Sequence, residues 1–343
     1  MSMGFAHAPA EPASAGRSTW TDAIDVHHHI VPAFYRKALD ANGLLNPLPG
    51  VEYPRWDVEA SLAMMQRQGI ATAIVSVSVP GVSLADAGAG AVLARRLNEF
   101  MADLVADHPG RFGAFAAIPM HDVSVALDEL RYALDTLKLD GIGLFTNYRG
   151  VYLADPVFEA LLDEVHQRGV VVHVHPAAPP AAEQPTFGLP ASLYEFTFET
   201  TRLAAQLLYN RTLERYPGLR MILSHGGGAV PYLAQRLTYG SVIQPNLAER
   251  TPADPIGSLQ TLYYDLAMSG SPYSLPSLAA FVPASKVLVG TDFPFMPAWT
   301  SEKNAHNTLI YPGFNDDDLR RIARENAEEL FPRLKSLTTR GSQ

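Results

Sequence analysis

The sequence predicts an α/β fold, a (β/α)8 TIM barrel formed by one chain of 343 residues. Short apolar or β-branched runs alternate with longer segments of helical period along most of the chain. Most of these runs are apolar throughout, which is typical of strands covered on both faces by helices. The alternative is a doubly wound open sheet, but no glycine-rich dinucleotide loop follows the first run.

Eight runs are predicted to be the barrel strands. They are Ala23–His27, Ala71–Val79, Gly113–Ile118, Gly141–Thr146, Val170–His175, Arg220–Ser224, Thr261–Leu266 and Lys286–Gly290.

The segments between and after these strands are predicted to be helices. They are Asp57–Gln68, Asp86–Asp107, Val123–Leu137, Pro156–Arg168, Leu193–Tyr216, Val230–Tyr239, Ser274–Phe281 and Asp316–Phe331. Asp57 and Asp86 stand where an N-cap carboxylate accepts hydrogen bonds from free backbone amides. The last helix has an acidic first turn, which suits the helix dipole.

Composition divides the chain and excludes several classes of function. Residues 1–22 are rich in Ala, Pro, Ser and Gly and are expected to be a disordered tail. Residues 23–333 are expected to form the single catalytic barrel, and residues 334–343 a C-terminal tail.

A net charge of -9 argues against a nucleic-acid partner. Cysteine is absent, which excludes disulfides and thiolate sites. No run approaches the ~18 apolar residues of a membrane span. We expect a cytoplasmic protein without a membrane partner.

The motif Asp25-Val26-His27-His28-His29 stands at the tip of the first strand. Successive side chains of a strand point to opposite faces, so His27 and His29 share one face while His28 turns away. Two such imidazoles can hold one divalent ion, although an isolated pair of this kind is also compatible with a polar surface loop.

The ends of the other strands supply partners for this pair. A TIM barrel assembles its active site at the C-terminal ends of its strands. There the sequence places His175 on the fifth strand, His225 after the sixth and Asp292 after the eighth. His173 lies one layer deeper and is expected to be a hydrogen-bonded interior residue. The remaining histidines are expected to be surface or structural residues: His7, His108, His121, His166 and His306.

We predict that His27, His29, His175 and Asp292 bind one divalent ion, with Zn²⁺ favoured over Mn²⁺. The fourth strand ends in Gly143-Leu144-Phe145-Thr146-Asn147, without the lysine that, once modified, usually bridges two ions in binuclear barrels of related design, which favours a single metal. His225 is assigned to proton transfer or to polarising a metal-bound water. The alternatives for His225 are a fourth histidine ligand or a buried core histidine.

Four motifs together resemble the amidohydrolase-2 branch of the metal-dependent hydrolase superfamily. They are Asp25-Val26-His27-His28-His29, Val174-His175-Pro176, Ser224-His225-Gly226-Gly227-Gly228 and Gly290-Thr291-Asp292-Phe293-Pro294-Phe295. The resemblance covers residues 22–333 and is strongest to decarboxylases of aminocarboxymuconate semialdehyde, γ-resorcylate and 6-methylsalicylate. The segments Asp25–Tyr35 and Trp56–Pro80 are most similar to the 6-methylsalicylate enzymes.

The resemblance implies roles for two further residues and a homodimer. Arg236 would bind the substrate carboxylate, in its own or a neighbouring subunit, although an exposed helix residue is an equal alternative. Phe295 would pack against the ring of a small aromatic carboxylic acid.

The implied reaction is loss of CO2 from a hydroxybenzoate-type acid after protonation of the ring carbon. In it Asp292 delivers the proton and His225 adjusts its state. The same residues could instead form a metal-bound hydroxide that hydrolyses a lactone or an amide. A metal-holding barrel without catalysis is a third possibility. The loops Pro32–Arg55, with Phe34, Tyr35 and Tyr53, and Ala177–Pro190 are expected to close over a partly apolar pocket.

Overall fold

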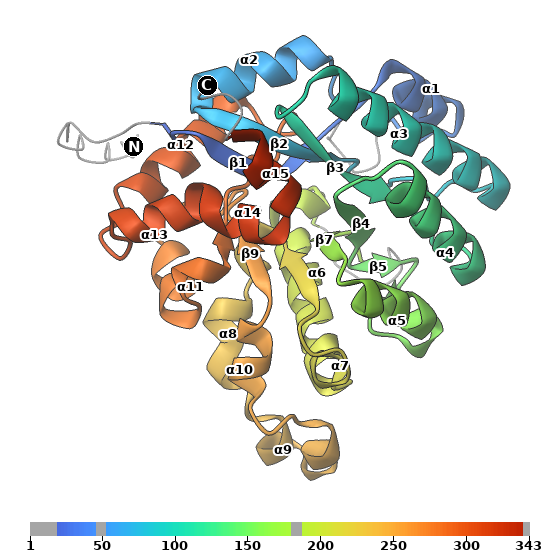
Figure 1. The fold of residues 1–343 in the computed structure, drawn as a ribbon. Coiled ribbons are helices and arrows are strands. Elements are labelled where there is room, and N and C mark those ends of the chain that lie inside the picture. The colour runs from blue at the N-terminus through green and yellow to red at the C-terminus, as the bar shows by residue number, and fades with distance from the viewer. Residues whose placement is uncertain (1–18, 46–52, 180–186, 339–343) are drawn as a thin grey trace, which may run out of the picture.

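The computed structural model describes residues 19–45, 53–179 and 187–338. Within them an eight-stranded parallel sheet has the order β1-β2-β3-β4-β7-β8-β9-β10 (Figure 1). The strands are β1 (Ala23–His29), β2 (Ile70–Ser76), β3 (Phe112–Ala117), β4 (Gly141–Phe145), β7 (Val171–His175), β8 (Arg220–Leu223), β9 (Tyr263–Asp265) and β10 (Val287–Leu288).

The sheet closes on itself between its first and last strands. Asp25 pairs with Val289 and His28 with Phe293 as isolated parallel bridges, and the Val26 amide donates to the Val289 carbonyl at 2.9 Å. The predicted (β/α)8 barrel is therefore confirmed.

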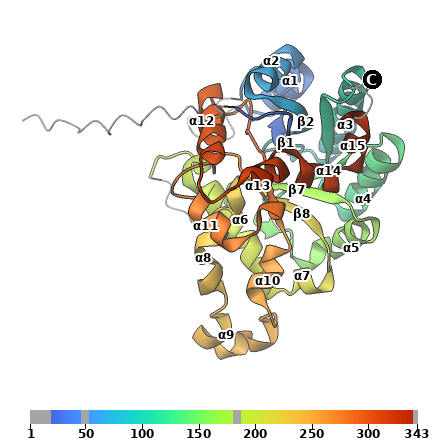
Figure 2. The same cartoon turned by 60° about the vertical axis from the view of Figure 1, so that its left-hand side comes forward.

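Helices surround this barrel on its outer side (Figures 1 and 2). They are α1 (Ala33–Ala41), α2 (Val58–Gln68), α3 (Ala87–Asp107), α4 (Val123–Arg131), α5 (Glu159–Arg168), α6 (Ala191–Tyr209), α7 (Thr212–Arg215), α8 (Val230–Leu237), α9 (Gly240–Ile243), α10 (Pro255–Gln260), α11 (Leu275–Phe281), α12 (Ala298–Leu309), α13 (Asp316–Arg320), α14 (Asn326–Leu330) and α15 (Pro332–Thr338). The two predicted N-caps are confirmed, because Asp57 accepts from the Ala60 amide at 2.7 Å and Asp86 from the Ala89 amide at 2.9 Å.

Some elements differ from the prediction. The single helix expected over Leu193–Tyr216 is divided into α6 and α7, because Arg211 adopts a left-handed backbone with φ +53°. Helices α1 and α12 and the short hairpin of β5 (Asn147–Tyr148) with β6 (Val151–Tyr152) lie where no element was predicted. Among the described residues no helix combines the length and the apolar character needed to cross a bilayer.

The base of the barrel is closed by the C-terminal segment. Phe331 and Leu334 are 2% and 1% exposed and pack with inward side chains of the strands, and the Phe331 ring lies 5.7 Å from that of Phe115. The buried core thus extends past the predicted boundary at residue 333. It also extends before residue 23, since Trp20 is 5% exposed.

We expect Phe331→Ala to destabilise the barrel by about 3–5 kcal/mol, because it removes a large buried side chain and leaves a cavity in the core. The measurement is the free energy of unfolding in urea. Val92→Ala on α3 is the control, since Val92 is 71% exposed and should change stability by less than about 0.5 kcal/mol. Equal effects of the two substitutions would contradict the role of Phe331.

Candidate metal centre

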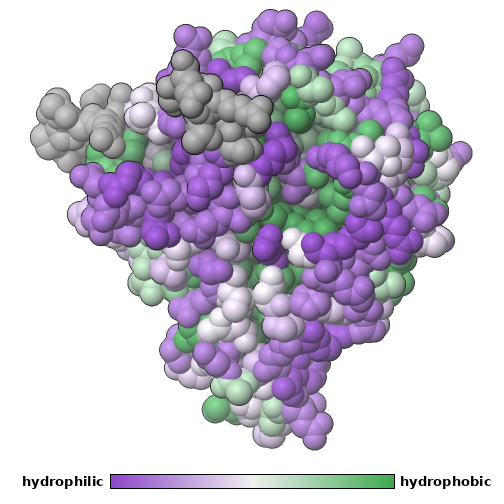
Figure 3. Space-filling model, in the orientation of Figure 1, coloured by the Kyte–Doolittle hydropathy of each residue, from purple (hydrophilic) through white to green (hydrophobic). Residues whose placement is uncertain are grey.

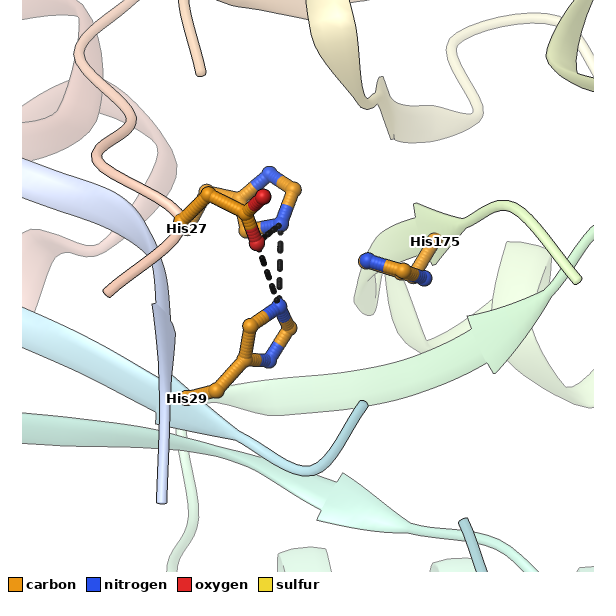
Figure 4. A group of neighbouring side chains, drawn as sticks. His27, His29 and His175 are labelled. Carbon is orange, nitrogen blue, oxygen red and sulfur yellow. Dashed lines mark hydrogen bonds and ion pairs between the residues drawn. The ribbon is translucent and has the colours of Figure 1, made fainter. Parts of the chain in front are cut away.

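Four side chains from three places in the chain meet at the C-terminal end of the barrel. The nitrogens or oxygens of His27, His29, His175 and Asp292 all lie within 4.8 Å of one another, and all four residues are buried. Figure 4 shows one ring nitrogen of His27 directed at one of His29, with His175 across from them on β7. The structure thus brings together the four residues that the strand ends predicted.

The spacing within this cluster fits a metal ion. The Nε2 atoms of His27 and His29 are 3.1 Å apart, and Asp292 Oδ1 lies 3.4 Å and 3.2 Å from them. Ligands at about 2.1 Å from a shared ion lie about 3.0–3.4 Å from one another in octahedral or tetrahedral geometry. The donor set, imidazole nitrogens and one carboxylate, suits a divalent transition metal.

Each of the three imidazoles is held through its other nitrogen. Nδ1 of His27 bonds Asp265 at 2.9 Å, Nδ1 of His29 bonds the Ser76 hydroxyl at 3.1 Å, and Nδ1 of His175 bonds the Pro176 carbonyl at 2.8 Å. The carboxylate and the carbonyl accept from Nδ1 of His27 and His175, and the Ser76 hydroxyl can do the same for His29, so Nε2 is the atom that each ring presents to a metal ion.

Asp265, at the end of β9, was missed by the sequence analysis. Its carboxylate also contacts His173 Nε2 at 3.2 Å and accepts from the backbone amides of His225 and Ala267, both at 3.0 Å. His173 is 1% exposed and hydrogen-bonded, as expected of an interior residue. A search for carboxylates within one residue of each predicted strand end would have found Asp265.

The carboxylates control the protonation of His27. Burial alone lowers its pKa, but the neighbouring Asp265 and Asp292 outweigh that effect and raise the pKa of His27 to about 10. Burial and the adjacent His27 lower the pKa of His29 to about 4, and burial with the neighbouring imidazoles holds the pKa of His175 well below its usual range. At neutral pH the cluster therefore contains one imidazolium and two neutral imidazoles.

Asp292 is an anion in this environment. Burial by itself raises the pKa of Asp292, but the contacts with His225, His27 and His29 hold it well below the ordinary value. The predicted role of Asp292, delivery of a proton to the substrate ring, requires a protonated carboxyl. Asp292 must therefore first take that proton from a bound molecule.

His225 lies beside the cluster on a glycine-rich turn. Its Nε2 is 3.8 Å from Asp292 Oδ2, and its buried Nδ1 has no hydrogen-bond partner among the described residues. A Cβ at Gly228 would come within 2.0 Å of the Thr197 carbonyl oxygen, so the turn that carries His225 can pack against α6 only with glycine there.

The two predicted substrate residues lie in different places. The Phe295 ring is 5.4 Å from the His29 ring and 5.2 Å from that of Tyr53, next to the cluster. Arg236 lies on α8, exposed, and no contact joins it to the cluster within the described part of this chain. The structure therefore places Phe295 at the site and leaves Arg236 outside it in a single subunit.

The other predicted surface histidines stand apart from the cluster. His108 and His166 pack near the rings of Phe112 and Tyr216 at 5.7 Å and 5.6 Å. His121 and His306 lie on the loop after β3 and on α12. His7 lies outside the described residues.

The loop prediction needs correction. Phe34 packs against Phe100 of α3 at 5.6 Å, so it faces away from the barrel mouth. Tyr35 and Tyr53 are buried, and their hydroxyls donate to the carbonyls of Gly81 and Ser78 at 2.9 Å and 3.1 Å. Tyr35 and Tyr53 thus anchor the described part of the loop, and Tyr53 also contacts Phe295 beside the cluster. Residues 46–52 and 180–186 of the two predicted loops lie outside the described residues.

Among the described residues two cavities lie near the cluster, although none of its four side chains lines either one. One of about 980 Å³ lies over the ends of β2, β3, β4 and β7, and Phe145 in its wall has its ring 6.2 Å from that of His175. Its wall is mainly apolar, with side chains such as Val82, Met120 and Phe158. The other, of about 280 Å³, is lined by His225 and by serine and tyrosine side chains. Both are large enough for an aromatic ring.

Comparison with known proteins identifies the family. Residues 24–333 match the amidohydrolase family. The chain is 35% identical over 328 residues to the decarboxylase yanB of Aspergillus niger, covering 92% of this chain and 88% of that protein. It is 34% identical over 318 residues to the 6-methylsalicylic acid decarboxylase of Penicillium expansum, covering 92% and 97%. A crystal structure of a dihydroxybenzoic acid decarboxylase from Polaromonas, with bound manganese and the inhibitor 2-nitroresorcinol, superimposes with a TM-score of 0.77 at 24% identity, covering 91% of this chain and 97% of that one. The chain belongs to the amidohydrolase family.

Proposed function

We propose that this protein is a metal-dependent decarboxylase that releases CO2 from a small hydroxybenzoate of the 6-methylsalicylate type. The observation that carries the proposal is the buried group of three imidazoles and one carboxylate at the barrel mouth, in a chain whose relatives of 34–35% identity are named decarboxylases. Nothing in the geometry favours the lactone or amide hydrolase over this reaction.

The metal would be held by His27, His29, His175 and Asp292. A bound divalent ion would supply a Lewis acid that stabilises negative charge on the substrate. The preference for Zn²⁺ rests on the ligand types, whereas a related structure contains manganese, so both ions are candidates.

Asp292 would carry the proton. Because its pKa is held low, it enters the reaction as a carboxylate, and we infer that it first accepts the proton of the substrate phenol. It then donates that proton to the ring carbon that bears the carboxylate. The bond from this carbon to the carboxylate breaks, its electron pair restores the aromatic ring, and CO2 leaves. The phenol oxygen regains a proton from solvent, so one proton is consumed in the whole reaction.

The remaining residues would orient the substrate. His225 Nε2, 3.8 Å from Asp292 Oδ2, can steady the carboxyl group while it gains and loses the proton. Phe295 offers an apolar ring beside His29, against which an aromatic substrate can pack.

A cation for the substrate carboxylate would come from a second subunit. Helices α8, α9 and α10 project from the barrel in both ribbon views, and hydrophobic surface lies at the tip that α9 forms (Figures 1, 2 and 3). Tyr232, Val242 and Ile243 on this arm are 81%, 79% and 70% exposed, which favours a protein interface. We propose a cytoplasmic homodimer in which this arm carries Arg236 to the partner's site.

Metal binding should release about one proton per ion at pH 7, because only His27 among the three imidazoles is protonated there. The apparent affinity should rise about tenfold per pH unit below the pKa of His27, since the proton competes with the ion for Nε2. Titration calorimetry in buffers of different ionisation enthalpy measures the proton count. Tight binding without proton release would show that the metal does not displace the proton of His27, and hence that His27 is not a ligand.

The purified enzyme loaded with Zn²⁺ or Mn²⁺ should release CO2 from 6-methylsalicylate or a related hydroxybenzoate and no acid from lactones. Asp292→Asn should lower kcat by at least about 10²-fold, because an amide cannot carry the proton. Asp128→Asn is the control, since the Asp128 side chain is 80% exposed. Acid release from lactones without CO2 from any hydroxybenzoate would replace the decarboxylase with the hydrolase.

Mixing two inactive variants tests the role of Arg236. If Arg236 acts across the dimer, Arg236→Ala mixed with Asp292→Asn should recover about a quarter of the wild-type activity, because half of the dimers are mixed and each has one intact site. If Arg236 acts within its own subunit, no activity returns. Sedimentation of the mixture checks that subunits have exchanged.

A further inference from the structure

Asp25 joins the two strands that close the barrel. It is fully buried, and its Oδ1 accepts from the backbone amides of His27 at 3.0 Å and Thr291 at 3.1 Å. Its Oδ2 accepts from the Thr291 hydroxyl at 2.6 Å and contacts His28 Nδ1 at 3.1 Å. The carboxylate thus has four donors, two of them from Thr291, next to the predicted ligand Asp292.

His28 is the middle histidine of the triplet and points away from the metal cluster. It is fully buried, and its Nε2 lies 3.0 Å from the Ser61 hydroxyl of α2, which accepts from Trp56 Nε1 at 2.8 Å. Trp56 donates to the Ser61 oxygen, which leaves the Ser61 hydroxyl proton free to be donated to His28 Nε2, while the Asp25 carboxylate accepts from His28 Nδ1. In this arrangement His28 donates from Nδ1 and accepts at Nε2.

The first and last strands of the barrel, β1 and β10, are joined by less regular pairing than the other neighbouring strands. The strands β1 and β10 share no regular ladder and meet through two isolated bridges, whereas the other neighbouring strands pair over consecutive residues. Asp292 follows directly, with a left-handed backbone of φ +61° and its amide bonded to the His27 carbonyl at 2.9 Å. The bonds of Asp25 fix the residues on both sides of this contact.

We propose that His28 is a positioning residue of the metal centre. By holding the Asp25 carboxylate, it keeps Thr291, and hence Asp292, opposite His27 and His29, although His28 itself touches neither the ion nor the substrate. The inference rests on the proposed metal-binding function of the cluster. It separates His28 from its two neighbours, which supply ligands directly.

A pair of substitutions at position 28 separates the bond from His28 to Asp25 from the bond between His28 and Ser61. The amide nitrogen of Asn, a donor, is as many bonds from Cα as Nδ1 of histidine, and the amide oxygen of Gln, an acceptor, is as many as Nε2. His28→Asn therefore keeps the donor to Asp25 and loses Ser61, whereas His28→Gln keeps the bond to Ser61 and loses Asp25. Each variant removes one buried hydrogen bond, so their thermal midpoints without metal should fall by similar amounts.

The readout is the dissociation constant for Mn²⁺ and Zn²⁺, measured by titration, together with kcat and KM of the metal-loaded enzyme. We expect His28→Gln to weaken metal binding by about 10–100-fold, as removal of an outer hydrogen bond does at metal sites, and to lower kcat more than it raises KM. His28→Asn should stay within about threefold of the wild type. Equal metal affinities in the two variants would overturn the proposal.

Thr291→Val provides a second test if the variants at position 28 do not fold. It removes the hydroxyl donor to Asp25 at nearly constant volume, and it should weaken metal binding as His28→Gln does. Ser61→Ala leaves the bond between His28 and Asp25 intact and should bind metal like the wild type. If Thr291→Val and Ser61→Ala bind metal equally well, the positioning role fails.

The two proposals fail separately. If the wild type binds metal and the variants differ in metal affinity as expected, but the metal-loaded wild type decarboxylates no hydroxybenzoate, the positioning role is retained and the proposed reaction is rejected. Wild-type protein that binds neither ion would reject both.

Discussion

The carboxylate of Asp265 is the group on which the arrangement of the metal centre depends. It lies fully buried inside the barrel and contacts His27 of β1, His173 of β7, and the backbone amides of His225 and Ala267 after β8 and β9. A buried carboxylate is tolerated only when its oxygens are hydrogen-bonded, so its four partners are constrained to meet there. The orientation of the His27 ring follows from this constraint.

The charges around His27 explain why the cluster suits a cation. Asp265 and Asp292 are both held as anions, whereas burial keeps His29 and His175 neutral. The proton on His27 is then the positive charge between two carboxylates, and a divalent ion that replaces it adds one further charge. The same carboxylates that raise the pKa of His27 should therefore favour the metal, at the cost of one released proton.

The sequence predicted the elements that follow simple rules, and the misses have physical causes. His27, His29, His175, His225 and Asp292 were found because strand ends of a barrel converge. Asp265 was missed because the seventh strand was extended by one residue to Leu266, which hid the carboxylate inside it. The break after α6 has no glycine or proline to mark it, since Arg211 itself adopts the left-handed conformation. Arg236 cannot be placed from one chain if a second subunit completes the site.

His225 and Asp292 share a conformation that connects function to stability. Both have a left-handed backbone, with φ +57° and +61°, which costs a non-glycine residue on the order of 1 kcal/mol. In each case a backbone amide bond holds the residue, from His225 to Asp265 and from Asp292 to the His27 carbonyl. Glycine would adopt either conformation more easily but would remove the imidazole or the carboxylate. The strain therefore falls at two residues that lie at the cluster, and these backbone hydrogen bonds offset it.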